Sequence, residues 1–279
     1  MSEPGAGDDL LAGLLHGLHP DRLLAHPRAT GEGVRVALID SGVDRARLQQ
    51  RQQSRGFELV PIEGAIFRED TLEPVPDEGR TSSPHGTTVA DIVLSQAPRV
   101  RLYSADVFGP AGTSDVRVVI RAIRWAMDVW SAQVINLSLG IPEQRLMQVP
   151  RRQDFLRVIE EAYHRDVIVV AAAANDHPLT RSYPAVFAPP LLSVDRGDFD
   201  DPLEVAYHPR GQVEFQARAR GSLGPFASQP ATSWAAPHLS GVVARLLSLR
   251  PGLKPFEVKT LLYWMDQARR GAGDRPAGA

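Results

Sequence analysis

The chain has 279 residues, and 43% of them are apolar, which is enough for the core of one or two domains. Its 31 lysines and arginines nearly balance 33 aspartates and glutamates, and a net charge of −2 gives no reason to expect nucleic acid or an acidic membrane as partner. No apolar run approaches the ~18 residues of a membrane-spanning helix. The absence of cysteine excludes disulfides, thiol catalysis and cysteine-ligated zinc.

The first residues predict an arm rather than part of the fold. Met1–Asp9 is acidic where a signal peptide is positively charged, and the apolar stretch Leu10–Leu18 is broken by His16 and two glycines. We therefore expect a cytoplasmic protein. Its residues 1–27 are expected to form an N-terminal arm with one short helix over Asp9–His19.

Short apolar, β-branched runs alternate with amphipathic segments along the rest of the chain. In chain order these patterns predict a strand over 34–39, loops with one short strand over 45–83, a helix over 85–94, a strand over 99–108, a helix over 114–130, a strand over 134–140, a helix over 154–165, a strand over 167–174 and helices over 233–250 and 255–265. Strands that are apolar on both faces and alternate with helices are typical of a parallel sheet covered on both sides. The sequence thus predicts a three-layer α/β/α sandwich with a mostly parallel central sheet. We expect residues 28–268 to form its one domain and residues 269–279 to form a disordered tail.

Three polar segments stand at element boundaries, where an open α/β sheet places its ligand site. They are Asp40-Ser41-Gly42, His85-Gly86-Thr87 and the segment 231–238, which contains Ser233. A serine hydroxyl becomes a nucleophile when an imidazole takes its proton, and the imidazole needs a carboxylate to fix its tautomer. Taken singly, each residue has a structural interpretation as a turn residue or a helix cap. Together they favour a catalytic triad.

The same segments resemble the signatures of the subtilisin-like serine peptidases, or subtilases, of peptidase family S8. Asp-Ser-Gly, His-Gly-Thr-Thr-Val-Ala and Thr-Ser-Trp-Ala-Ala-Pro-His stand in the order of that family. Further segments that fit are 30–34, 134–140, 172–175, 183–185 and 237–251. The resemblance covers about residues 28–268.

The resemblance implies a serine endopeptidase that acts through an acyl-enzyme. Ser233 would be the nucleophile, His85 the general base and Asp40 the residue that orients His85. Asn175 would donate its side-chain amide to the oxyanion, together with the backbone N–H of Ser233. No cofactor and no metal are implied.

The resemblance also assigns the surfaces that hold the substrate, which would be a peptide or a protein. These residues are Ser138, Leu139, Gly140, Ala172, Ala173, Ala174, Gly112 and Thr232.

The sequence departs from the family at four points. Alanine replaces glycine at Ala174 and Ala231, which predicts a tighter pocket and a preference for small residues before the scissile bond. Trp234 stands where methionine is common, and its bulk is expected to pack behind the nucleophile. The loop Ser95–Pro98 is too short for the calcium site of many secreted members. The arm is too short for an inhibitory propeptide of domain size.

Without such a propeptide, we expect activity to be restrained by a narrow cleft, by a regulatory partner or inhibitor, or by the arm or segment 45–83. A dedicated peptide or protein substrate is expected. The alternative function is a degenerate subtilisin fold kept as a binding or regulatory module. The substitutions at Ala174, Ala231 and Trp234 favour it, whereas the intact Asp40, His85, Asn175 and Ser233 argue against it.

Overall fold

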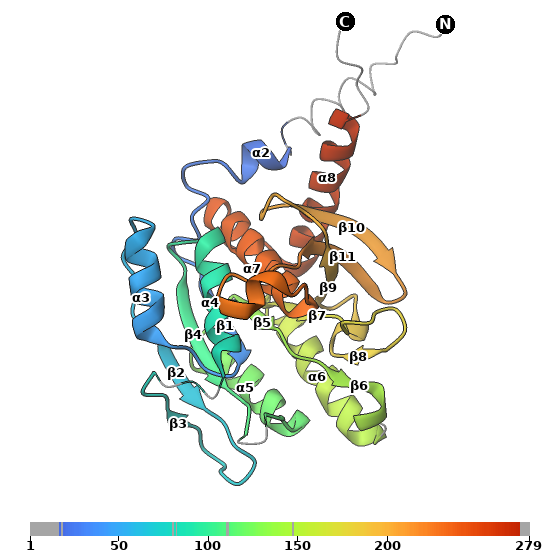
Figure 1. Ribbon diagram of the computed structural model, residues 1–279. Coiled ribbons are helices and arrows are strands. Elements are labelled where there is room, and N and C mark those ends of the chain that lie inside the picture. Colours follow the sequence, from blue (N-terminus) through green and yellow to red (C-terminus); the bar gives the residue numbers. More distant parts are fainter. Residues whose placement is uncertain are drawn as a thin grey trace, which may run out of the picture.

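The structure of the protein is a computed structural model that describes residues 17, 19–79, 81, 83–109, 112–146 and 148–273 (Figure 1). Its elements in chain order are α2 (Pro20–Leu23), β1 (Arg35–Asp40), α3 (Arg45–Ser54), β2 (Glu63–Ile66), β3 (Val75–Pro76), α4 (Pro84–Gln96), β4 (Arg101–Asp106), α5 (Val116–Asp128), β5 (Val134–Leu137), β6 (Ile141–Pro142), η1 (Glu143–Arg145), α6 (Val149–His164), β7 (Ile168–Ala172), β8 (Ser182–Tyr183), η2 (Ala185–Phe187), β9 (Leu192–Gly197), β10 (Val205–Arg210), β11 (Val213–Arg218), η3 (Gly224–Ser228), α7 (Thr232–Leu249) and α8 (Pro255–Gly273).

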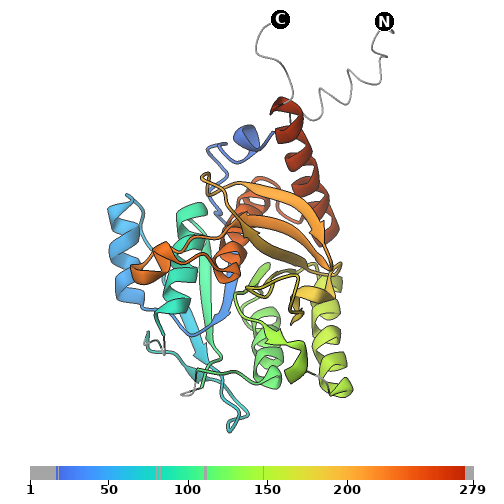
Figure 2. The same cartoon turned by 45° about the vertical axis from the view of Figure 1, so that its right-hand side comes forward.

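A nine-stranded sheet runs through the described part of the chain in the order β10-β11-β9-β7-β5-β1-β4-β2-β3. The seven strands from β11 to β2 are parallel, and only the edge strands β10 and β3 are antiparallel to their neighbours. Figure 2 shows β10 and β11 at one end of this sheet, beside α8. The predicted mostly parallel sheet is confirmed.

Helices cover both faces of the sheet, as alternate strand residues show. In β1, Val36 and Leu38 belong to a core shared with α4 and α7, whereas Ala37 and Ile39 belong to a second core shared with α5 and α6. All four side chains are at most 1% exposed. A strand buried on both faces needs apolar residues at every position, which explains the unbroken run 36–39. The predicted three-layer sandwich is therefore confirmed.

Segment 45–83 contains a helix where the sequence predicted loops. The carboxylate of Asp44 caps α3 by accepting a hydrogen bond from the backbone N–H of Arg47 (3.0 Å). The buried face of α3 presents Leu48 and Gln52, and the Gln52 amide donates to the carbonyl of Pro98 (3.2 Å). Because a single leucine makes no apolar stripe, periodicity alone missed this helix.

The last helix also extends further than the pattern predicted. Instead of ending at Met265, α8 continues to Gly273, so the part of the predicted tail that the structure describes is helical. Ion pairs from Arg269 to Glu204 (2.8 Å) and from Arg270 to Asp266 (2.9 Å) hold this end. The remaining tail residues, 274–279, lie outside the described residues.

Most of the predicted arm, including the helix expected over Asp9–His19, also lies outside the described residues. The part nearest the fold is anchored, because Leu24 is 1% exposed and its carbonyl accepts a hydrogen bond from Arg245. Across the described ranges, none of the helices combines the length and the apolar character needed to cross a bilayer.

Candidate active site

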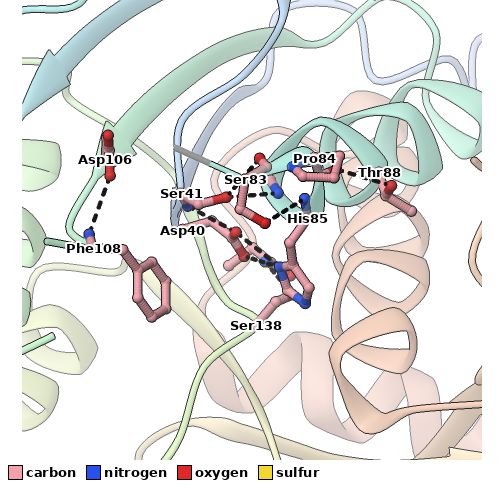
Figure 3. Close-up of polar contacts among 11 residues, drawn as sticks. Asp40, Ser41, Ser83, Pro84, His85, Thr88, Asp106, Phe108 and Ser138 are labelled. Carbon is pink, nitrogen blue, oxygen red and sulfur yellow. Dashed lines mark hydrogen bonds and ion pairs between the residues drawn. The ribbon is translucent and has the colours of Figure 1, made fainter. Parts of the chain in front are cut away.

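Asp40 and His85 meet at the carboxyl end of β1. The Asp40 carboxylate, 1% exposed, points at the imidazole of His85 in the first turn of α4 (Figure 3). Nδ1 of His85 lies 2.8 Å from Oδ1 and 3.1 Å from Oδ2 of Asp40. An ionised carboxylate only accepts hydrogen bonds, so Nδ1 carries the proton and Nε2 keeps its lone pair. This tautomer is the one that a general base needs.

The pairing also changes the acidity of the imidazole. Burial of His85 disfavours its protonated form, but the charge of Asp40 and the hydrogen bond to it together outweigh burial. The pKa of His85 is therefore raised above its ordinary value of 6.5. Asp40 makes His85 a stronger base.

The close approach of α4 to the loop after β1 depends on Ser41 and Gly86. The Ser41 hydroxyl donates to the Ser83 carbonyl (3.1 Å) and accepts from the Gly86 N–H (3.1 Å). A Cβ at Gly86 would lie 2.3 Å from the carbonyl oxygen of Gly42 and 3.1 Å from Oδ1 of Asp40. Glycine is thus required sterically here. This role of Ser41 was not predicted from the sequence, although its place in the Asp-Ser-Gly segment is a signal for it.

A cavity of about 520 Å³ opens beside the Asp40–His85 pair. Its described walls include parts of the segments 108–114 and 138–142, together with Val119 and Arg145. Four of the predicted substrate-binding residues line it, namely Gly112, Ser138, Leu139 and Gly140. These four therefore lie where a substrate can meet His85.

A buried hydrogen-bond network connects this cavity to α7. Nδ2 of Asn136 donates to the hydroxyl of Ser138 (2.9 Å), and the hydroxyl of Ser240 donates to Oδ1 of Asn136 (3.0 Å). Ser240 and Asn136 are 0% exposed. The cavity wall is therefore fixed relative to the helix that carries Ser233.

Ser233 and Asn175 lie together at the N-terminus of α7. Ser233 is the second residue of this helix and is partly exposed. Oδ1 of Asn175 accepts hydrogen bonds from the backbone N–H (2.9 Å) and the hydroxyl (3.1 Å) of Thr232. Nothing in the described chain accepts a hydrogen bond from Nδ2 of Asn175. Thr232 thus fixes the amide with its NH₂ group available as a donor.

The side chain of Trp234 contacts His85. Within the described chain no hydrogen bond joins Ser233 to His85. Instead the indole of Trp234 lies against the imidazole, with ring centroids 4.8 Å apart and planes tilted by 35°. The indole is 2% exposed, contacts Phe226 (5.0 Å between centroids) and donates from Nε1 to the carbonyl of Gln229 (2.9 Å). The bulk of Trp234 is therefore buried beside His85, whose own side chain stays 26% exposed.

The predicted residues therefore form two groups. The first group lies around the cavity and consists of Asp40, His85, Gly112, Ser138, Leu139 and Gly140. The second group lies at the start of α7 and the end of β7 and consists of Ser233, Asn175, Thr232, Ala172, Ala173 and Ala174. Ala172 and Ala173 are buried, at 1% and 6% exposure. Ala231 has φ −148° and ψ 152°, an extended conformation that alanine adopts without strain.

The described residues show no group of three or more histidine, aspartate or glutamate side chains arranged to hold a metal ion. The loop predicted to be short connects the end of α4 at Gln96 to the start of β4 at Arg101.

The sequence is similar to one known protein family and to known proteases. Residues 31–198 match the subtilase family, Peptidase S8. The M-protease of Shouchella clausii (strain KSM-K16) is 29% identical in an alignment 256 residues long, which covers 85% of this chain and 60% of that protein. The chain thus spans about 60% of the length of this relative.

Two solved structures share the fold. Sphericase superposes with a TM-score of 0.64 at 21% identity, covering 83% of this chain and 82% of that one. The prenylagaramide maturation protease PagA has a TM-score of 0.59 at 24% identity, covering 87% of this chain and 85% of that one.

Proposed function

Because the chain belongs to the subtilase family, we propose that it is a serine endopeptidase whose triad is Asp40, His85 and Ser233. The observation that carries this proposal is the Asp40–His85 pair, in which Nδ1 is bound to the carboxylate at 2.8 Å and Nε2 is left as a base. The Asn175 amide beside Ser233 adds the donor that acyl transfer requires.

In the proposed reaction, Nε2 of His85 takes the proton of the Ser233 hydroxyl as its oxygen attacks the peptide carbonyl. The tetrahedral oxyanion accepts hydrogen bonds from Nδ2 of Asn175 and from the backbone N–H of Ser233. The protonated His85, stabilised by Asp40, then gives its proton to the leaving amine. A water molecule then attacks the acyl-enzyme and gives its proton to His85. His85 returns a proton to Ser233 as the acyl group leaves. For the first proton transfer, the Ser233 hydroxyl has to come within hydrogen-bond reach of Nε2 of His85, and such contacts often tighten only when substrate is bound.

We further propose that the substrate is a dedicated peptide or protein and that the enzyme acts in the cytoplasm. The hydrogen bond between Ser233 and His85 that would activate the nucleophile is absent from the described chain, which restrains activity until a suitable substrate or a regulatory partner brings the two side chains together. PagA, which shares the fold, is a maturation protease. Cleavage of polypeptides encoded next to this gene tests the dedicated substrate. Fractionation of cells that express the protein tests the location.

One observation favours a second function. The absence of a Ser233–His85 hydrogen bond within the described chain, with Trp234 packed on His85, fits a subtilisin fold retained as a binding or regulatory module. Such a module would bind peptide in the cavity and would leave it intact.

A fluorophosphonate probe distinguishes the two functions, since it labels only an activated serine. We expect labelling of the full chain, with loss in Ser233→Ala and strong reduction in His85→Ala. Ser228→Ala, which removes an exposed hydroxyl from the neighbouring η3, is the matched control and should label normally. Labelling that persists in Ser233→Ala would refute the assignment of the nucleophile. No labelling together with retained peptide binding would establish the binding module.

A further inference from the structure

Arg145 places an uncompensated positive charge in the wall of the cavity beside Asp40 and His85. It is the last residue of η1, it is exposed, and it lines the cavity. No acidic side chain of the described chain forms an ion pair with it. The nearest acid in sequence, Glu143, is engaged elsewhere, accepting from the Tyr183 hydroxyl (3.2 Å) and pairing with Arg181 (3.6 Å).

The other charges of the cavity do not neutralise Arg145. Among the described lining residues, the ionisable side chains are Asp40, His85 and Arg145. Asp40 is 1% exposed and bound to His85 through both carboxylate oxygens. A guanidinium presents its N–H donors in a planar fork that matches a carboxylate, and it stays charged at all physiological pH values.

We propose that Arg145 is a specificity-determining residue that selects an acidic side chain, aspartate or glutamate, in the substrate. This inference rests on the proposed function, because it assumes that a peptide lies between the segments 108–114 and 138–142 with its scissile bond at Ser233. The acidic residue would occupy the cavity with its carboxylate on the guanidinium of Arg145.

The expected size of the preference for an acidic residue follows from the exposure of Arg145 to solvent. Because Arg145 is open to solvent, its pairing with a carboxylate is weaker than a buried pair and is screened by salt. We expect an acidic residue to raise kcat/KM by about three- to tenfold over the isosteric amide. Raising the salt concentration to 0.5 M should remove most of this preference.

The test uses alanine-rich fluorogenic hexapeptides in pairs, with one glutamate or one glutamine at each position in turn. Cleavage is measured with the wild-type chain, Arg145→Gln and Arg145→Glu. Arg117→Gln is the matched control, since Arg117 is also an exposed arginine near the cavity but is paired with Asp115 (2.9 Å) and does not line it. Binding of the same peptides to Ser233→Ala is measured by fluorescence anisotropy.

At one position, glutamate should be preferred over glutamine by the wild type and by Arg117→Gln. The preference should vanish in Arg145→Gln, and Arg145→Glu should favour glutamine over glutamate there. A glutamate preference that survives in Arg145→Gln, or no preference at any position, would overturn the proposal. If no peptide is cleaved, fluorophosphonate labelling of Ser233 decides the proposed function. The Glu/Gln binding ratio of Ser233→Ala, compared with that of Ser233→Ala combined with Arg145→Gln, then decides the role of Arg145 separately.

Discussion

The indole of Trp234 packs against the imidazole of His85, with 4.8 Å between ring centroids. The residue that follows Ser233 in sequence therefore contacts the base that we propose activates Ser233. Phe226 packs on the same indole, and the Trp234 Nε1–H bond to Gln229 holds it in place. Together these contacts fix the indole beside His85, whose side chain is 26% exposed.

If this contact restrains activity, a smaller and flexible residue should release it. We expect Trp234→Met to speed fluorophosphonate labelling of Ser233 severalfold, because a flexible methionine in place of the indole packed on His85 lets Ser233 and His85 approach each other more easily. The melting temperature should fall, since a side chain that is 2% exposed loses volume. Trp264→Met on α8 is the control for the general effect of such a replacement. Equal or slower labelling of folded Trp234→Met would show that the indole does not restrain the base.

Asn175→Ala should act on the transition state. The oxyanion exists only near the transition state, so loss of the Nδ2 donor should lower kcat by about 10²–10³ with little change in KM. Steady-state kinetics on a cleavable peptide measure both constants. Asn175→Asp keeps the acceptor for Thr232 but removes the donor, and it should be equally impaired. A rise in KM alone would contradict this role of Asn175.

The pH dependence of kcat/KM should report the Asp40–His85 pair. Only neutral His85 acts as a base, and its pKa is raised above 6.5, so activity should increase with pH and its acid limb should lie above pH 6.5. In Asp40→Asn the charge that raises this pKa is gone. The acid limb should then move to lower pH while the maximal rate falls sharply. An unchanged limb in Asp40→Asn would mean that another group titrates.

Gly86→Ala should disrupt the site without a change in polarity. Its new Cβ would lie 2.3 Å from the carbonyl oxygen of Gly42, which forces α4 away from β1. We expect a loss of stability of about 1–3 kcal/mol and a drop in activity of at least tenfold. Gly271→Ala, at a helical position with nothing within 4 Å, is the control. Full activity in Gly86→Ala would show that the loop after β1 yields easily.

His238 should make the fold sensitive to acid. It is 5% exposed, and burial lowers its pKa to about 4. Its unfolded pKa of 6.5 is higher, so the unfolded chain binds more protons between these values. The free energy of unfolding should therefore be constant with respect to this group above pH 6.5 and fall as the pH drops toward 4, by about 3 kcal/mol in total.

Chemical denaturation of the wild type and of His238→Gln between pH 8 and pH 4 measures this difference. The variant is expected to be less stable at neutral pH, because it alters contacts with Gln96 and Pro202. Its stability should nevertheless decrease less steeply with acid. Parallel pH curves for the two proteins would rule out His238 as the titrating group.

The sequence alone was sufficient for the layered α/β architecture and for the positions of Asp40 and His85. Strands such as 36–39 are buried on both faces, so every residue of the run is apolar. This pattern can be recognised without knowing which elements pack against the strand. The polar segments at the ends of such runs mark the edge of the sheet where a site forms. These signals are local in the chain.

Only the tertiary structure decided the rest. The helix α3 was hidden because its buried face holds one leucine and a glutamine whose partner, Pro98, is distant in sequence. The position of the Trp234 ring on His85, the orientation of the Asn175 amide by Thr232 and the place of Arg145 in the cavity wall all depend on how separate segments pack. A residue pattern reports that a side chain is buried or exposed, but the partner of that side chain is set by the packing of elements that the chain brings together from far apart.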